Sequence, residues 1–194
     1  MMKKILLAAG LLSLLTVGAN AADYVIDNKG AHASVNFKIQ HLGYSWLTGR
    51  FNTFEGQFSY DAAKPTESKI SVSINTKSID SNHAERDKHL KSDDFLHVDK
   101  YPQAKFISTK IEELGGEKLK VHGNLTLHGM TNNIVIITNK IGEGKDPWGG
   151  YRAGFEGTTR ISMADYGITY NLGPASTHVD LTLHIEGINT NRLK

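Results

Sequence analysis

The densest group of side chains able to do chemistry lies between residues 83 and 90, a charged stretch that contains two histidines. Neutral imidazole and carboxylate are good zinc ligands, so this composition suggests a metal or acid–base site. The spacing argues against one, because His83 and His89 are six residues apart and would lie on opposite sides of a helix. Glu85 and His89 could pair across one turn, but two ligands do not make a structural zinc site. We therefore expect a solvated helix here, and a histidine- or metal-dependent hydrolase is the alternative.

The sequence carries no other recognisable catalytic signature. Its remaining histidines are scattered, and it has no G-x-S-x-G motif of the kind that places a nucleophilic serine. The absence of cysteine excludes thiol catalysis, iron–sulfur clusters and zinc–cysteine sites. The glycine-rich run at residues 146–150 opens no helix, and it is typical of a turn rather than of a phosphate-binding loop. We predict no catalytic residue, no metal ligand and no cofactor.

The first residues have the three-part pattern of a secretory signal peptide. Two lysines give a positive start, residues 5–17 form an almost unbroken apolar run, and residues 19–21 supply a small-x-small cleavage pattern. The apolar run is too short to span a bilayer, and no other stretch approaches the required length. A buried N-terminal helix is the alternative. We expect residues 1–21 to be cleaved and residues 22–194 to form a single exported domain without a transmembrane segment.

The charge of the exported part is balanced. The whole chain has a formal net charge of +2 at pH 7, and removal of Lys3 and Lys4 leaves 0. Nucleic acid binding needs a concentrated basic surface, so we expect no nucleic acid partner. An exported domain without disulfides must be held together by its core and by the hydrogen bonds of its sheet.

Most of the exported part alternates between apolar and polar side chains. In residues 33–40, for example, every second side chain is apolar, from Ala33 to Ile39. Successive side chains of a strand point to opposite faces, so each strand has one apolar and one wet face, which is typical of antiparallel sheets. The alternation predicts about eight strands, at residues 33–40, 47–51 with 54–60, 70–75, 105–111, 119–127, 134–141, 151–161 and 178–186.

Two places interrupt the alternation. The phase slips by one residue near Asn52 and Thr53, which predicts a β-bulge or bend. Residues 82–96 are charged and poor in apolar side chains, which predicts a short surface helix capped by Ser81 or Asn82. The chain shows no linker and no internal repeat, so we predict an all-β fold with one short helical segment.

Strands with one apolar face must either close into a barrel or form a sandwich. Closure removes exposed edge strands, and an eight-stranded barrel is about the size that holds one small ligand. A Greek-key sandwich gives nearly the same sequence pattern, so periodicity alone favours the barrel only slightly. Periodicity also does not distinguish a filled interior from a lined tunnel, and for an average β-domain a filled core is the more common result.

A series of short motifs runs in order through the chain. The motifs are residues 36–43 with Trp46, residues 81–90 with Ser92, residues 94–96, Tyr101-Pro102, and residues 123–129, 146–150 and 171–176. In these motifs the sequence resembles the YceI-type family of bacterial periplasmic polyisoprenoid-binding proteins. The resemblance implies a closed eight-stranded antiparallel lipocalin-like barrel whose long apolar pore holds an isoprenoid chain. It also implies a periplasmic location and the homodimers that family members often form.

On this basis we expect the inward apolar faces to line a pore rather than to fill it. The side chains expected to line it are Phe37, Ile39, Phe51, Phe58, Val72, Ile74, Phe95, Phe106, Leu125, Leu127, Phe155, Leu181 and Leu183. Arg86 and His89 are expected at the entrance, where they face a head group or water. The predicted function is that of a binding protein, and not an enzyme, that transports, stores or scavenges an isoprenoid-like lipid such as a polyprenyl chain or a quinone tail.

Overall fold

Strands dominate the computed structural model, which describes residues 21–192. The predicted signal peptide, apart from its last residue, lies outside the described residues. The strands are β1 (Ala22–Ile26), β2 (Ser34–His41), β3 (Ser45–Phe51), β4 (Phe54–Tyr60), β5 (Lys69–Asn75), β6 (Ile79–Asp80), β7 (Gln103–Gly115), β8 (Lys118–Leu127), β9 (Met130–Lys145), β10 (Tyr151–Ser162) and β11 (His178–Asn189). The described helical elements are α1 (Ala84–Lys91) and short 3₁₀ turns at Pro65–Glu67, Thr76–Ser78, Ala164–Tyr166, Pro174–Ser176 and Thr190–Arg192.

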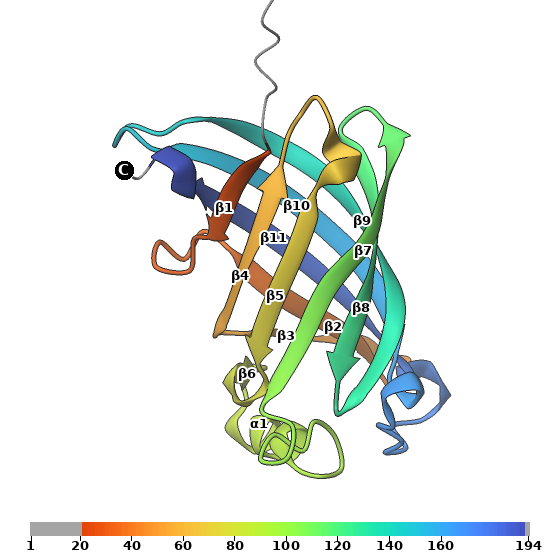
Figure 1. Ribbon diagram of the computed structural model, residues 1–194. Helices are drawn as coiled ribbons and strands as arrows, with labels where there is room; N and C mark the ends of the chain where they lie inside the picture. Colours follow the sequence, from red (N-terminus) through yellow and green to blue (C-terminus); the bar gives the residue numbers. More distant parts are fainter. Residues whose placement is uncertain (1–20, 193–194) are drawn as a thin grey trace, which may run out of the picture.

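The strands form one antiparallel sheet that closes on itself (Figure 1). Around the ring the order is β1-β4-β5-β7-β8-β9-β10-β11, and β11 pairs back with β1. One part of β11, residues 187–189, makes this closing contact, while residues 180–184 pair with β2. From β2 the sheet continues to β3 and β6. The closed barrel is therefore confirmed, and the Greek-key sandwich is excluded.

Three ribbons of the barrel are each broken into two strands. Residues 27–33 separate β1 from β2, residues 52–53 separate β3 from β4, and Thr76–Ser78 separate β5 from β6. The eleven strands therefore make eight ribbons, as predicted. The bend predicted at Asn52 and Thr53 is the break between β3 and β4. Strand β1 was not predicted, because its apolar residues follow one another without alternating.

The helix is shorter than the predicted segment of residues 82–96 and has a different cap. The N-cap is His83, whose Nδ1 accepts the backbone N–H of Arg86 at 3.2 Å. The predicted caps, Ser81 and Asn82, lie before this position. The Ser81 hydroxyl is instead bonded by the Arg86 guanidinium, at 2.7 Å from its Nε. The sequence pattern located the helix but did not define its ends.

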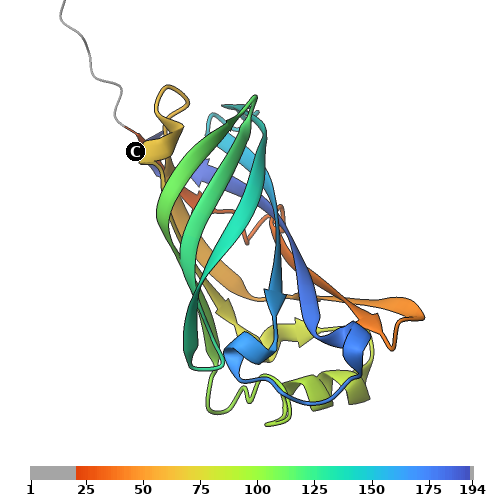
Figure 2. The ribbon, with the colours of Figure 1, turned by 90° about the vertical axis from the view of Figure 1, so that its right-hand side faces the viewer.

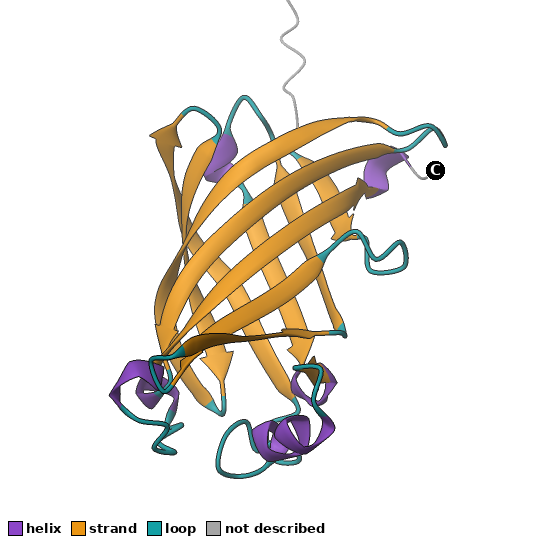
Figure 3. Ribbon diagram, turned by 180° about the vertical axis from the view of Figure 1, so that it is seen from behind, coloured by secondary structure: helices purple, strands orange, loops and turns teal. Residues whose placement is uncertain are grey.

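The two ends of the barrel carry different segments. Figures 2 and 3 show α1, the β2–β3 turn and the segment between β10 and β11 gathered at one end. The β9–β10 turn and the C-terminal end of β11 lie at the other end (Figure 1). Alternate side chains point inward, as in β2, where Val35 and Phe37 are buried. In the part of the chain that the structure describes, no helix is long and apolar enough to cross a membrane.

Candidate ligand-binding cavity

The interior of the barrel contains an apolar cavity of about 650 Å³ at the end that carries α1. We call it the outer cavity, and its size falls within the range of roughly 300–1,000 Å³ that is typical of small-molecule sites. Eight of the predicted pore residues line it: Phe37, Ile39, Phe51, Ile74, Phe95, Leu125, Leu127 and Leu181. Periodicity left the interior either filled or lined, and the structure has the lined arrangement.

A second apolar cavity, the inner cavity, lies deeper in the barrel and measures about 140 Å³. The other five predicted pore residues line it: Phe58, Val72, Phe106, Phe155 and Leu183. Four side chains line both cavities, and we call them the waist: Val35, Ile74, Leu125 and Leu181. The two cavities therefore adjoin at the waist. That the predicted residues contact a ligand remains a prediction.

Aromatic rings bound the inner cavity on the side away from α1. The Phe155 ring meets Tyr60 and Phe58 edge-on, with ring centroids 5.1 and 5.7 Å apart. Phe58 also stacks on Tyr24 at 4.8 Å. Burial raises the pKa of the Tyr60 hydroxyl, although the nearby Lys140 ammonium opposes this effect. The phenol is therefore neutral, and this side of the cavity presents aromatic rings and no anionic phenolate.

Sequence reasoning missed other residues that line the cavities. Leu47, Val121 and Ile136 are among them, and each lies in the apolar phase of its strand. The alternation could have identified these three. Met163 and Leu172 also line the outer cavity, but they lie in the segment between β10 and β11, which has no alternation. No periodic signal marks such residues, because an irregular segment has no fixed inward phase.

The two polar residues predicted at the entrance both line the outer cavity, and both are paired with protein groups. Arg86 donates from Nε to the Ser81 hydroxyl at 2.7 Å and from Nη2 to the Ser81 carbonyl oxygen at 2.5 Å. His89 Nε2 lies 2.9 Å from Asp94 Oδ2, so its partner is not Glu85, as the spacing had allowed. The entrance therefore has a fixed polar rim.

Rings on two separate segments meet at this rim. The His89 imidazole lies edge-on to Phe95 and to Tyr170, with centroids 4.9 and 5.1 Å apart. Tyr170 belongs to the segment between β10 and β11, whereas Phe95 follows α1. The contact joins these two segments over the mouth of the outer cavity, so the rim is held by side-chain packing.

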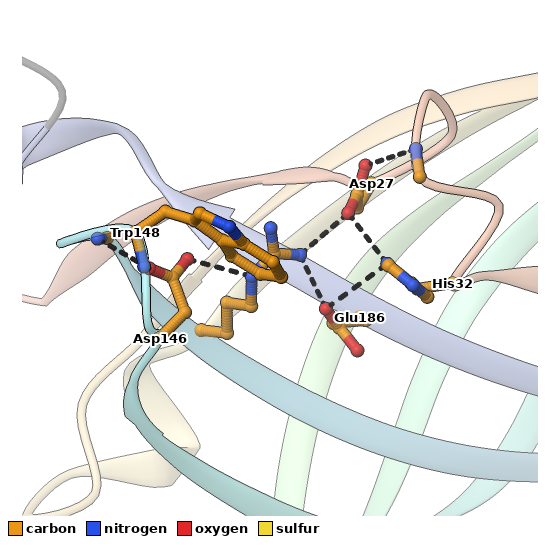
Figure 4. Close-up of polar contacts among 8 residues, drawn as sticks. Asp27, His32, Asp146, Trp148 and Glu186 are labelled. Carbon is orange, nitrogen blue, oxygen red and sulfur yellow. Dashed lines mark hydrogen bonds and ion pairs between the residues drawn. The ribbon is translucent and has the colours of Figure 1, made fainter.

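Potential metal ligands also gather at residues that line neither cavity. Asp27, His32 and Glu186 form the one group of three in the described chain whose ligand atoms lie within 4.8 Å of one another. Figure 4 shows a guanidinium among them, with Arg152 Nη1 2.6 Å from Asp27 Oδ2 and 2.5 Å from Glu186 Oε1. Because this cation already lies between the carboxylates, the group is an ion-pair cluster rather than a metal site.

The turn between β9 and β10 extends this cluster (Figure 4). Asp146 Oδ1 accepts the backbone N–H groups of Trp148 and Gly150, at 3.0 and 2.7 Å. Its Oδ2 accepts a hydrogen bond from Arg152 Nε at 2.9 Å. The Trp148 ring covers the guanidinium, whose Cζ lies 5.7 Å from the ring centroid. Residues 146–150 form a turn, as predicted, and the turn closes over Arg152.

Two carboxylates of the cluster, those of Asp27 and Asp146, are held in their ionised form. Burial raises the pKa of Asp27, but hydrogen bonds from Arg152, the Gly30 backbone and His32 outweigh it and hold the pKa at about 2. Burial also raises the pKa of Asp146, and bonds from Arg152 and from its own turn again bring it below the usual value. The cluster therefore ties the β1–β2 loop and the β9–β10 turn to the barrel wall by charged hydrogen bonds.

The comparisons of this chain with known proteins agree with one another. Residues 24–187 match the YceI-like domain family. A UPF0312 protein of Shewanella baltica is 58% identical over 189 residues, which are 96% of this chain and 99% of that protein. The crystal structure of the Campylobacter jejuni YCEI protein has a TM-score of 0.70 at 29% identity and covers 79% of this chain and 91% of its own.

A more distant likeness concerns the fold alone. The structure of a polyisoprenoid binding domain from Saccharophagus degradans, implicated in plant cell wall breakdown, has a TM-score of 0.63 at 16% identity. The match covers 88% of this chain and 99% of that domain.

Proposed function

Because this chain belongs to the YceI-like domain family, we propose that it is a periplasmic protein that holds one long isoprenoid-like lipid inside its barrel. The observation that carries the proposal is the pair of apolar cavities that adjoin at the waist and run through the barrel interior. An elongated apolar space of this kind suits a chain better than it suits a compact polar substrate. The polyisoprenoid-binding description of the Saccharophagus degradans domain supports the same ligand class.

Burial of the chain alone is sufficient to hold such a ligand. Each sheltered CH₂ contributes roughly 0.8 kcal/mol, so about twenty isoprenoid carbons give about 16 kcal/mol before costs. The loss of free motion and the ordering of a flexible chain offset a large part of this. Binding therefore does not require a charged anchor, which is consistent with Arg86 and His89 being bonded to protein groups.

The proposed role is binding without catalysis, a resident metal or a cofactor. The alternative, a hydrolase built on the α1 segment, has less support from the side chains. His83 accepts the first hydrogen bond of the helix, and His89 is paired with Asp94. A periplasmic site of action rests on the signal-peptide pattern of residues 1–21.

Organic extraction of the protein, purified from the periplasm under mild conditions, tests the proposal. Mass spectrometry of the extract is expected to find a prenyl lipid in an amount close to that of the protein. If the extract contains no such lipid and added polyprenol does not bind, the proposed function is wrong. Turnover of lipid esters that His89→Ala abolishes would favour the hydrolase instead.

A further inference from the structure

We infer that the β2–β3 hairpin docks this protein onto the surface of a lipid bilayer, with the hairpin tip in the interfacial layer and the barrel mouth turned toward the membrane. Figure 2 shows the hairpin projecting sideways from the end of the barrel that carries α1. Docking rests on the proposed function, since a lipid carrier must take its ligand from a membrane.

The tip of the hairpin is apolar and exposed. Leu42 is 53%, Tyr44 is 87% and Trp46 is 52% exposed. Three large apolar side chains within five residues form a patch of the kind that marks an interaction site. Tyrosine and tryptophan have an apolar body and a polar end, which is why both are enriched where membrane and water meet.

The backbone at the tip carries leucine where the turn favours another residue. Leu42 and Gly43 both have positive φ angles, of 52° and 82°, and the Tyr44 N–H bonds to the His41 carbonyl oxygen at 2.9 Å. The loop is residues 42–44, since His41 pairs with Ser45. Turn positions with positive φ favour glycine and asparagine, because a leucine is strained in the left-handed region. An exposed apolar side chain kept against local preference indicates a role for the side chain itself.

The charge of the hairpin suits a membrane surface. Between residues 34 and 51 the charged residues are Lys38 and Arg50, and there is no acidic residue. Arg50 lies opposite Asp80 of β6, so the positive charge near the tip comes from Lys38. The Lys38 ammonium lies 4.5 Å from the Trp46 ring centroid. A basic group beside an interfacial aromatic ring is placed to meet lipid phosphates.

The tip is continuous with the mouth of the outer cavity. Leu42 is exposed and also lines that cavity. Strand β2, which leads into the tip, is joined to the segment between β10 and β11, because the Ser176 hydroxyl donates to the Gln40 carbonyl oxygen at 2.6 Å. A prenyl chain leaving the bilayer beside the tip could therefore reach the cavity along Leu42 with little exposure to water.

The size of the patch favours a bilayer over a second copy of the chain. A standard protein interface buries about 800 Å² and roughly 20–30 residues on each partner, far more than one hairpin tip offers. A few interfacial side chains and one basic group are sufficient for reversible membrane binding, which scales with buried apolar area and with attraction to anionic lipids.

The two tryptophans of the chain allow a direct test, because they lie at opposite ends of the barrel. Trp148→Phe leaves Trp46 as the sole reporter, and Trp46→Phe leaves Trp148. With vesicles of mixed zwitterionic and anionic phospholipids, we expect Trp46 emission to shift to shorter wavelength and to be quenched by bromine-labelled lipid. Trp148, which is 79% exposed in the β9–β10 turn, is the matched control and should show neither effect.

Two variants separate docking from folding. Leu42→Asn suits the left-handed turn, so it should fold at least as well as the parent yet bind vesicles about tenfold or more weakly, the scale expected for one lost apolar side chain. Tyr44→Ser should weaken vesicle binding to a similar extent. Unchanged vesicle binding by both variants would overturn the inference.

The outcomes also distinguish docking from lipid carriage. If Trp46 does not respond to vesicles while the extract of the same protein contains a prenyl lipid, docking is wrong and carriage stands. If Trp46 responds but no prenyl lipid is bound, carriage is wrong. A shift of Trp46 emission that needs no vesicles and grows with protein concentration would show that a second copy covers the hairpin, and it would overturn docking.

Discussion

Arg152 Nη1 lies 2.6 Å from the Asp27 carboxylate, although the two residues are 125 positions apart in the chain. Asp27 follows β1, the strand that closes the barrel against β11, and Arg152 lies on β10. The bond therefore fastens the break between β1 and β2 to the neighbouring wall. Because Asp27 is only 5% exposed, its charge depends on this partner for compensation.

Replacement of Arg152 by methionine should destabilise the fold by about 3 kcal/mol, because it leaves a buried carboxylate without its cation. The matched control is Arg160→Met on the same strand. Arg160 is exposed, and its Nε lies 3.7 Å from the Asp180 carboxylate, a pair that contributes little. Urea unfolding of both variants measures the two free energies. Equal losses in the two variants would contradict the structural role of the cluster.

The low pKa of Asp27 predicts a loss of stability in acid. The carboxyl has a pKa of about 2 in the folded protein against an ordinary value of 3.8. A lowered folded-state pKa stabilises the protein above the unfolded value, and this contribution is lost as the pH falls from about 4 toward about 2. We expect Asp27 to account for about 2 kcal/mol of the stability lost in this range.

The Asp27→Asn variant isolates this contribution. Its unfolding free energy should change less between about pH 5 and about pH 2 than that of the parent protein, by about 2 kcal/mol. The substitution leaves carboxyls outside the cluster in the same surroundings, so the difference reports on Asp27 and the groups that share Arg152 with it. The same pH dependence in the two proteins would show that Asp27 is not held ionised.

The waist should control the length of chain that the barrel accepts. Leu181 lines both cavities, so Leu181→Trp should fill the passage between them. A short polyprenol that fits the outer cavity should still bind, whereas a long one should bind about tenfold or more weakly. The control is Ile107→Trp, at a residue that points outward from β7 and is exposed. Competition binding with short and long polyprenols measures the effect, and equal weakening of both would refute the assigned role of the waist.

The alternation of apolar side chains predicted the inward faces well, because strand geometry fixes which residues share a face. Phe37 and Leu183, for example, both lie inside as expected. Periodicity cannot show whether an interior is hollow, since that depends on the tilt and stagger of strands around the whole ring. The hollow interior was expected only from the family resemblance.

Contacts between distant segments could not be predicted from the sequence for a different reason. The pairing of Asp27 with Arg152 depends on how a loop folds across the outside of the barrel, and no sequence pattern encodes it. The same holds for Met163, which enters the cavity from an irregular segment. The cap was expected at Ser81 or Asn82 from residue preference, but His83 caps the helix. His89 pairs with Asp94, which lies beyond the end of α1, and helical spacing predicts neighbours only within the helix.

Native mass spectrometry of the intact protein tests lipid carriage most directly. The parent protein, supplied with a long polyprenol after delipidation, should carry one lipid for each chain. Leu183→Arg, which places a charge in the inner cavity, should carry none, while Ile107→Arg on the outer surface should bind like the parent. A parent protein that takes up no polyprenol, or a Leu183→Arg variant that binds as well as the parent, would contradict lipid binding inside the barrel.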